Sequence, residues 1–189
     1  MAQSQAMTAH QDLATALDAA GFWAEHPDRV RLLGYVAAGG SPIAELPDSD
    51  RGWWADGEDA AEGDVEEMLL EMAPALAKRG VVLSVLTVDG PHDEGSPGYA
   101  IRINGTGVEL YRYDPGEPNL PATEDPWLDC TIKPLAEVNR LLTLAGSADR
   151  MVVFYPGGND GLAALLPMAA IDVLATSPAI NDADRPVVP

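Results

Sequence analysis

The chain has 189 residues, 47% of them hydrophobic, which is enough for one domain with a full hydrophobic core. Aspartate and glutamate total 30 against 11 lysines and arginines, giving a net charge of -19 at pH 7. This charge argues strongly against nucleic acid and anionic membranes as partners. It favours a partner protein with a basic surface, or serves solubility alone.

The N-terminal sequence MAQSQAMTAHQ lacks a basic stretch followed by an apolar one, and no apolar run approaches the roughly 18 residues of a membrane-spanning helix. Cys130 is the single cysteine, so neither an intrachain disulfide nor a multi-cysteine metal site can form. These features predict a cytoplasmic protein that works under reducing conditions.

The first residues divide into a polar start and an amphipathic helix. Residues 1–8 are small and polar, and we expect them to be disordered. Residues 9–20 carry apolar side chains at helical spacing and end before Gly21, which predicts a helix. Residues 30–36 fit neither a helical nor a strand period, and their structure stays open.

Residues 45–71 hold eleven acidic side chains and one basic side chain, Arg51. The first half of this segment is rich in aspartate, glycine and proline, so we expect a surface loop. Asp64 is a good N-cap for a helix that ends at residues 78–80, and Pro74 inside that helix should kink it near Leu70.

The most strand-like run is VVLSVLTV at residues 81–88, whose apolar character predicts a central strand covered on one side by helices. A β-hairpin at residues 98–113 should continue it as a meander and reverse at Asn104-Gly105. A two-residue turn there places Ile101 opposite Val108 and Tyr99 opposite Leu110, whereas a four-residue loop pairs Ile103 with Val108 and Ile101 with Leu110. Both registers bury the same face and leave Arg102 and Glu109 on the other.

The last third alternates between proline-rich and apolar segments. Residues 114–126 contain four prolines and are expected to form a long surface loop, and residues 129–132 a short strand. Pro134 is expected at the first position of a helix that ends at Gly146. Residues 151–155 read as a buried strand, and Pro167 should separate a strand or helical turn from a terminal helix.

Together these elements predict an α+β domain with a mainly antiparallel sheet, formed by the meander 81–113 and the strand 151–155 and packed with amphipathic helices. The domain should span residues 9–176. Residues 177–189 are expected to form a flexible C-terminal tail.

The sequence contains no clear catalytic, phosphate-binding or metal-binding motif. PGGNDG at residues 156–161 lacks the lysine of a phosphate loop, so a tight turn is the better interpretation. The acidic segment does not fit an EF-hand, although an irregular calcium site stays as an alternative. His92 with Asp89, Asp93 and Glu94 is either a weak metal site or a solvated cluster. We predict no catalytic residue, no cofactor and no metal site.

Two adjacent tryptophans in the acidic segment are the best lead to a function. Surface tryptophans commonly anchor protein interfaces, although one or both can instead cover the core as a lid. The predicted partner-binding residues are the tryptophans and the carboxylates near them or in the loop after residue 88: Asp48, Asp50, Trp53, Trp54, Asp56, Glu58, Asp59, Asp89, Asp93 and Glu94.

The order of elements resembles a known group of proteins. A helix ending in AAGFW, the meander around GYAIRINGTGVELYRY, and PLAEVNRLLTLAG followed by MVVFYPGGNDG are similar to the immunity proteins of actinobacterial secreted-toxin systems. These include the factor that neutralises the tuberculosis necrotizing toxin, an NAD-degrading enzyme. The resemblance implies a protein that binds and blocks a toxin enzyme, and it identifies no contact residue. The alternative is a small enzyme or ligand-binding protein with a pocket between the meander and the helices.

Overall fold

Two neighbouring strands with apolar side chains on both faces organise the layers of the molecule. In β6 (Asp149–Phe154), Met151 and Val153 are buried on one face, while Val152 and Phe154 are buried on the other. The adjacent strand β7 (Leu162–Pro167) repeats this pattern. Because both faces are apolar, the sheet must be covered on both sides.

The computed structural model describes residues 2–24, 26–47, 49–91 and 95–189. Its helices are α1 Ala2–Ala19, α2 Arg29–Ala37, α3 Gly57–Asp59, η1 Ala60–Asp64, α4 Val65–Ala77, α5 Pro126–Leu144, α6 Met168–Thr176 and η2 Asp182–Asp184. Its strands are β1 Gly52–Trp54, β2 Val85–Asp89, β3 Gly98–Ile103, β4 Thr106–Asp114, β5 Glu117–Pro121, β6 Asp149–Phe154 and β7 Leu162–Pro167.

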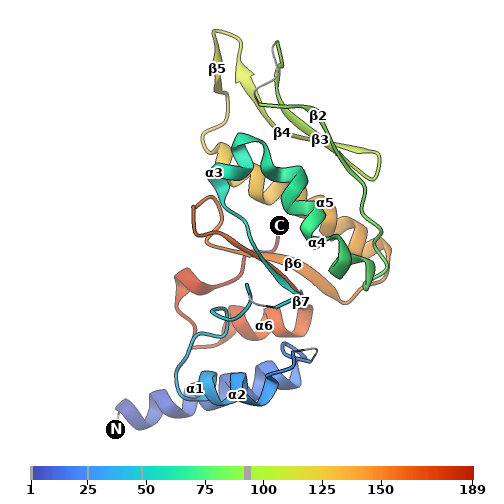
Figure 1. Ribbon diagram of the computed structural model, residues 1–189. Helices are drawn as coiled ribbons and strands as arrows, with labels where there is room; N and C mark the ends of the chain where they lie inside the picture. Colours follow the sequence, from blue (N-terminus) through green and yellow to red (C-terminus); the bar gives the residue numbers. More distant parts are fainter. Residues whose placement is uncertain (1, 25, 48, 92–94) are drawn as a thin grey trace.

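The structure is an α+β fold with two antiparallel sheets, as Figure 1 shows. A three-stranded sheet of order β1-β7-β6 lies between the helices α1, α2 and α6 on one side and α4 and α5 on the other. A four-stranded sheet of order β2-β3-β4-β5 covers the far side of α4 and α5. The α+β class is confirmed. The predicted strand at 151–155 does not join the sheet of the meander, however, because α4 and α5 lie between the two sheets and contribute apolar side chains to the core that both sheets share.

The first residues of two helices differ from the sequence predictions. Asp125 is the N-cap of α5 and accepts a hydrogen bond from the Leu128 N–H at 2.9 Å, with Pro126 directly after it. Residues 129–132 are therefore helical rather than a strand, and Pro134 lies inside the helix. At the other end of the chain, α1 begins at Ala2, so the helix includes residues that we expected to be disordered.

The hairpin turns at the predicted place. Asn104 and Gly105 have φ values of 45° and 86°, and Ile101 lies opposite Val108, which confirms the two-residue turn. A bulge between Tyr99 and Ala100 shifts the pairing beyond it, so Tyr99 lies opposite Tyr111 and not Leu110.

Both outer strands of the four-stranded sheet correct a prediction. β2 pairs with β3 and forms one edge, so it is not a central strand, and Leu86 and Val88 are 56% and 46% exposed on it. β5 forms the other edge within the proline-rich segment that we expected to be a loop. Proline is tolerated there because an edge strand needs hydrogen bonds on one side alone.

The C-terminal segment is attached to β6. Val187 and Val153 exchange two backbone hydrogen bonds of 2.8 Å, so this part of the expected flexible tail extends the three-stranded sheet. α2 resolves the segment that the sequence left open, with Leu32 and Val36 buried. Within the described ranges, the structure contains no helix long and apolar enough to cross a bilayer.

Candidate functional site

Strand β1 places the two tryptophans in different environments. It pairs with β7, with Trp53 opposite Ala163 and Trp54 opposite Leu162. Trp53 is partly buried and packs against the core that α4, α5 and both sheets share. Trp54 is 63% exposed. The segment expected to be a surface loop therefore contains a strand, and only its second tryptophan lies open to solvent.

The glycine-rich turn at residues 156–161 holds the chain that follows Trp54. The Ala55 N–H donates to the Gly161 carbonyl at 2.8 Å, and the Gly57 N–H donates to the Gly158 carbonyl at 3.0 Å. A Cβ atom on Gly161 would lie 2.2 Å from the Ala55 carbonyl oxygen, so the close approach requires glycine. The turn thus fixes the backbone of the acidic segment through these two hydrogen bonds.

Asp56 and Gly63 direct the next two turns of the chain. The Asp56 carboxylate accepts hydrogen bonds from the Glu58 N–H at 2.8 Å and the Asp59 N–H at 3.3 Å, which caps α3. Gly63, with φ 134°, interrupts the helical path before α4. Helix α4 then buries its apolar side, including Val65, Leu69 and Met72.

A groove lined by carboxylates runs between Trp54 and α4. We call it the acidic groove; its volume is about 180 Å³, and it is lined by Trp54, Asp56, Asp59, Ala60, Asp64, Glu67, Met68 and Glu71. These lining residues include five carboxylates and no lysine or arginine. The groove therefore combines one large aromatic ring with five negative charges.

The groove combines predicted and unpredicted residues. Trp54, Asp56 and Asp59 were predicted, whereas Asp64 at the end of η1 and Glu67 and Glu71 of α4 were not. A signal was available, because positions 64, 67 and 71 share one helix face opposite the apolar one. Glu58 lies beside the groove, where its carboxylate accepts a hydrogen bond from the Asn159 side chain at 3.0 Å.

The other predicted partner-binding residues lie elsewhere. Asp50 forms an ion pair with Lys78 at 2.6 Å, and that hydrogen bond lowers the pKa of its carboxyl. Asp89 lies at the end of β2 and lines a separate small depression with Glu109 and Arg112. Asp48, Asp93 and Glu94 lie outside the described residues, as does His92. Trp53 contributes to the core rather than to the groove.

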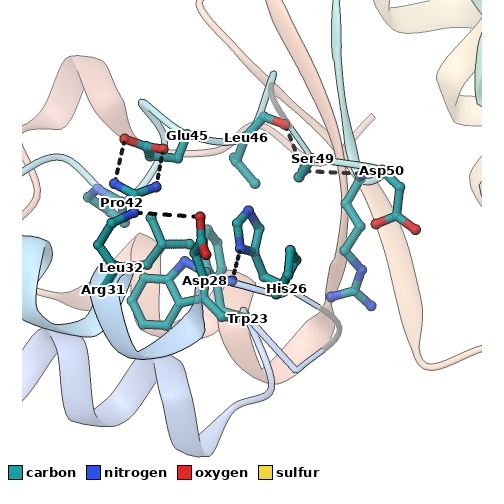
Figure 2. Close-up of a pocket in the computed structure, with 13 residues that line it drawn as sticks. Trp23, His26, Asp28, Arg31, Leu32, Pro42, Glu45, Leu46, Ser49 and Asp50 are labelled. Atoms are coloured by element: carbon teal, nitrogen blue, oxygen red, sulfur yellow. Dashed lines mark hydrogen bonds and ion pairs between the residues drawn. The ribbon is translucent and has the colours of Figure 1, made fainter.

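A second concave region lies between the segment that joins α1 to α2 and the segment that leads from α2 to β1. This pocket of about 530 Å³ has an apolar part formed by Phe22, Trp23, Leu32, Pro42 and Leu46. Figure 2 shows Arg31 paired with both Glu45 and Asp28. Arg31 bonds to Glu45 at 2.8 Å and lies 3.7 Å from Asp28. Arg31 also lowers the pKa of Glu45 by this hydrogen bond.

The histidine and serine of this pocket do not form a nucleophile and base pair. The His26 Nδ1 accepts a hydrogen bond from the Asp28 N–H at 3.1 Å. The Ser49 hydroxyl donates to the Leu46 carbonyl at 2.7 Å instead of to the imidazole. A serine nucleophile needs a base within hydrogen-bond reach of its own proton.

The single cysteine is buried and is not an activated nucleophile. Cys130 is buried in α5, and burial raises the pKa of its thiol to about 12, so the thiol is protonated at neutral pH. In the described part of the chain, no three histidine, cysteine, aspartate or glutamate side chains are placed to hold a metal ion.

Comparisons of the chain with protein-family models, with curated proteins and with solved structures found no match.

Proposed function

We propose that this protein is a non-catalytic cytoplasmic inhibitor that binds a partner protein, most concretely an immunity protein that neutralises a toxin enzyme. The observation that carries the proposal is Trp54, which is 63% exposed in a groove lined by five carboxylates. The resemblance seen in the order of the sequence elements suggests the toxin.

An exposed tryptophan that is fixed on a strand is suited to be an interface anchor. Its large ring is apolar, and β1 holds its backbone against β7, so little conformational entropy is lost when a partner covers it. Trp53, its neighbour, is already used by the core. The exposed ring of Trp54 has no comparable structural role in the described contacts, which supports a role in binding.

The surrounding charge indicates the chemistry of the partner. Carboxylates without cations among the groove lining, together with a net charge of -19, attract a basic surface and speed its approach. Enzymes that act on phosphorylated or other anionic substrates have basic clefts, and an acidic inhibitor can cover such a cleft. We therefore place the acidic groove against a basic cleft of the toxin.

The proposal is tested in the native host. Tagged protein is used to recover its partner, and the recovered partner is expressed with and without this protein. Survival only in the presence of this protein is expected. Recovery of no partner, together with no protection, would contradict the proposal.

The role of Trp54 is tested with Trp53 as its matched control. Trp54→Ala should weaken binding of the partner by about 2 kcal/mol, mostly through faster dissociation, with an unchanged melting temperature. Trp53→Ala should lower the melting temperature instead, because it removes core contacts. If Trp54→Ala lowers only the melting temperature, Trp54 is part of the fold and the groove is not the interface.

The charges of the groove are tested through the association rate. Raising the salt concentration should slow association while dissociation changes less. The double substitution Glu67→Gln with Glu71→Gln should reduce this salt dependence. Salt-independent association would remove the acidic groove from the interface.

A second function has one observation in its favour, the pocket shown in Figure 2. Its volume of about 530 Å³ lies in the range of small-molecule sites, and its apolar part includes Trp23. It is not the pocket between meander and helices that the sequence suggested, since α1 and α2 lie at the other end of the molecule. A thermal-shift screen of metabolites checks it, because a ligand of the folded state raises the melting temperature.

A further inference from the structure

The β2 edge of the four-stranded sheet lies beside a second groove that shares residues with the acidic groove. We call it the edge groove; its volume is about 610 Å³, and it is lined by Gly63, Asp64, Glu66, Glu67, Leu70, Glu71 and Thr87. Its lining joins the N-terminal half of α4 to strand β2. We propose that the edge groove binds an extended, lysine- or arginine-bearing segment of the partner, which adds to β2 as a further strand.

The register of β2 shows which backbone groups face the edge. The Asn104 N–H donates to the Ser84 carbonyl at 2.8 Å, and Val85 lies opposite Ile103. Hydrogen-bonded and non-bonded pairs alternate in an antiparallel ladder, so the backbone groups of Val85 and Thr87 point away from β3. A strand that arrives at this side can bond to them.

A carboxylate already occupies one of these positions. The Glu66 Oε2 atom accepts hydrogen bonds from the Thr87 N–H at 2.7 Å and from the Thr87 hydroxyl at 2.8 Å. A peptide carbonyl can replace it at the Thr87 N–H. The Glu66 carboxylate, displaced from Thr87, would then pair with a lysine or arginine of the arriving segment. The ligand itself therefore neutralises the negative charge of Glu66.

The side chains near the edge fit an alternating basic and apolar segment. The edge groove has four carboxylates and no cation among its lining residues. Leu70 in the groove is 46% exposed, and Leu86 and Val88 are exposed on the outer face of β2. Successive side chains of a strand point to opposite faces, so basic side chains can reach α4 while apolar ones cover Leu86 and Val88.

The charge also selects between occupants. A second copy of this chain would bring another net charge of -19 to the same acidic surface, and the two copies would repel. A basic segment of a different protein gains from the same charges. The inference rests on the proposed function, since it describes how a basic partner protein would be held.

The test uses a fluorescent peptide of alternating lysine and valine with the full-length protein. The control peptide has the same sequence, but N-methyl groups on every residue remove the backbone donors along both edges. The first peptide should bind about tenfold more tightly than the second, which corresponds to the loss of one or two backbone hydrogen bonds. Equal affinities would show attraction by charge alone and would overturn the inference, as would no binding of either peptide.

Variants locate the binding on the protein. Thr87→Pro removes the edge donor at a position where proline spares the bonds to β3, and it should weaken the first peptide about tenfold. Glu117→Gln removes one charge at the opposite edge, in β5, and should leave the affinity unchanged. Melting temperatures show that both variants are folded, and sedimentation shows whether β2 edges pair between copies instead. An equal loss in both variants, or a dimer formed through β2, would contradict the inference.

The native partner separates this inference from the proposed function. If the partner depends on Trp54 but binds the Thr87→Pro variant normally, the edge groove is excluded and the proposed function stands. If no partner is found but the lysine-valine peptide binds with the predicted dependence on its N–H groups, the proposed function fails and the edge groove remains a peptide site.

Discussion

At the scale of single residues, Asp149 connects segments that are far apart in the sequence. Its carboxylate Oδ2 lies 2.5 Å from the Arg79 Nε after α4 and 3.2 Å from the Arg51 Nη2 before β1. Asp149 is 7% exposed, so this carboxylate compensates buried positive charge.

Replacing Asp149 should therefore strongly destabilise the fold. Asp149→Ala removes the carboxylate between two arginines and should cost about 3 kcal/mol in the free energy of unfolding. Asp50→Ala breaks an ion pair with Lys78 in which both side chains are exposed, and should cost less than about 1 kcal/mol. Urea denaturation of both variants measures the difference. Equal losses would mean that the Asp149 cluster contributes no more than a surface pair.

A second residue-scale prediction concerns the two faces of β3. Ile101 is 1% exposed and packs in the core, while Arg102 next to it is exposed. Ile101→Asp buries an unpaired charge and should cost more than about 3 kcal/mol, whereas Arg102→Asp should change the stability by about 0.5 kcal/mol. Thermal unfolding of each variant tests this, and similar losses from both would disprove the assignment of the faces.

At the scale of elements, the hairpin shows how a short signal fixes a register. Asn104 adopts φ 45°, its side-chain oxygen accepts a hydrogen bond from the Ser84 N–H at 2.6 Å, and its side-chain nitrogen donates to the Val82 carbonyl at 2.9 Å. The turn thus also fastens the chain that leads into β2. Gly105 follows with φ 86°.

The conformation at Gly105 gives the element-scale prediction. Gly105→Ala places a Cβ on a left-handed backbone and should cost about 1 kcal/mol in the free energy of unfolding. Gly107→Ala is the control, because Gly107 is exposed with open space around it and its φ is not positive. That substitution should change the stability by less than about 0.5 kcal/mol. Comparable costs at both positions would argue against the two-residue turn.

Elements with a local signal could be predicted, and those that depend on distant partners could not. The hairpin carries its own turn residues and the helix after Asp64 its own apolar face, so the sequence predicted both, although the Asp64 side chain makes no capping hydrogen bond. Strand β1 has three residues and exists because β7 pairs with it, while β5 contains prolines that only an edge strand accepts. The acidic groove was predicted in part, because its α4 residues join Trp54 only when β1 and the turn at 156–161 bring them together.

At the scale of the whole molecule, ion pairs within single elements and between neighbouring helices lower the pKa values of several carboxyls in different layers. Glu137 on α5 is the most buried of these carboxyls. A hydrogen bond from Arg140, with a further one from the Thr106 hydroxyl of β4, lowers the pKa of Glu137 below its ordinary value of 4.5. Asp18 and Glu109 are lowered in the same direction by Arg29 and Arg112.

The sign of the pH dependence follows from this direction. A carboxyl with a lower pKa in the folded protein than in the unfolded chain stabilises the fold fully above pH 4.5, and the stabilisation is lost as the pH falls through the folded pKa. We therefore expect the free energy of unfolding to fall as the pH is lowered below about 4.5. Protonation also relieves the repulsion among the carboxylates that give the net charge of -19, and this effect stabilises the folded state. We expect the loss of the paired carboxylates to be the larger of the two effects.

Arg140→Gln isolates the contribution of Glu137. The variant should be about 1 kcal/mol less stable than the wild type above pH 4.5, because Glu137 loses its charged partner. The difference should shrink as the pH falls, since Glu137 is then protonated in both proteins. Arg112→Gln on the exposed pair with Glu109 is the control and should show a smaller difference. Urea denaturation at several pH values between 7 and 3 measures both, and a difference for Arg140→Gln that stays constant across this range would show that Arg140 acts through packing rather than through the charge of Glu137.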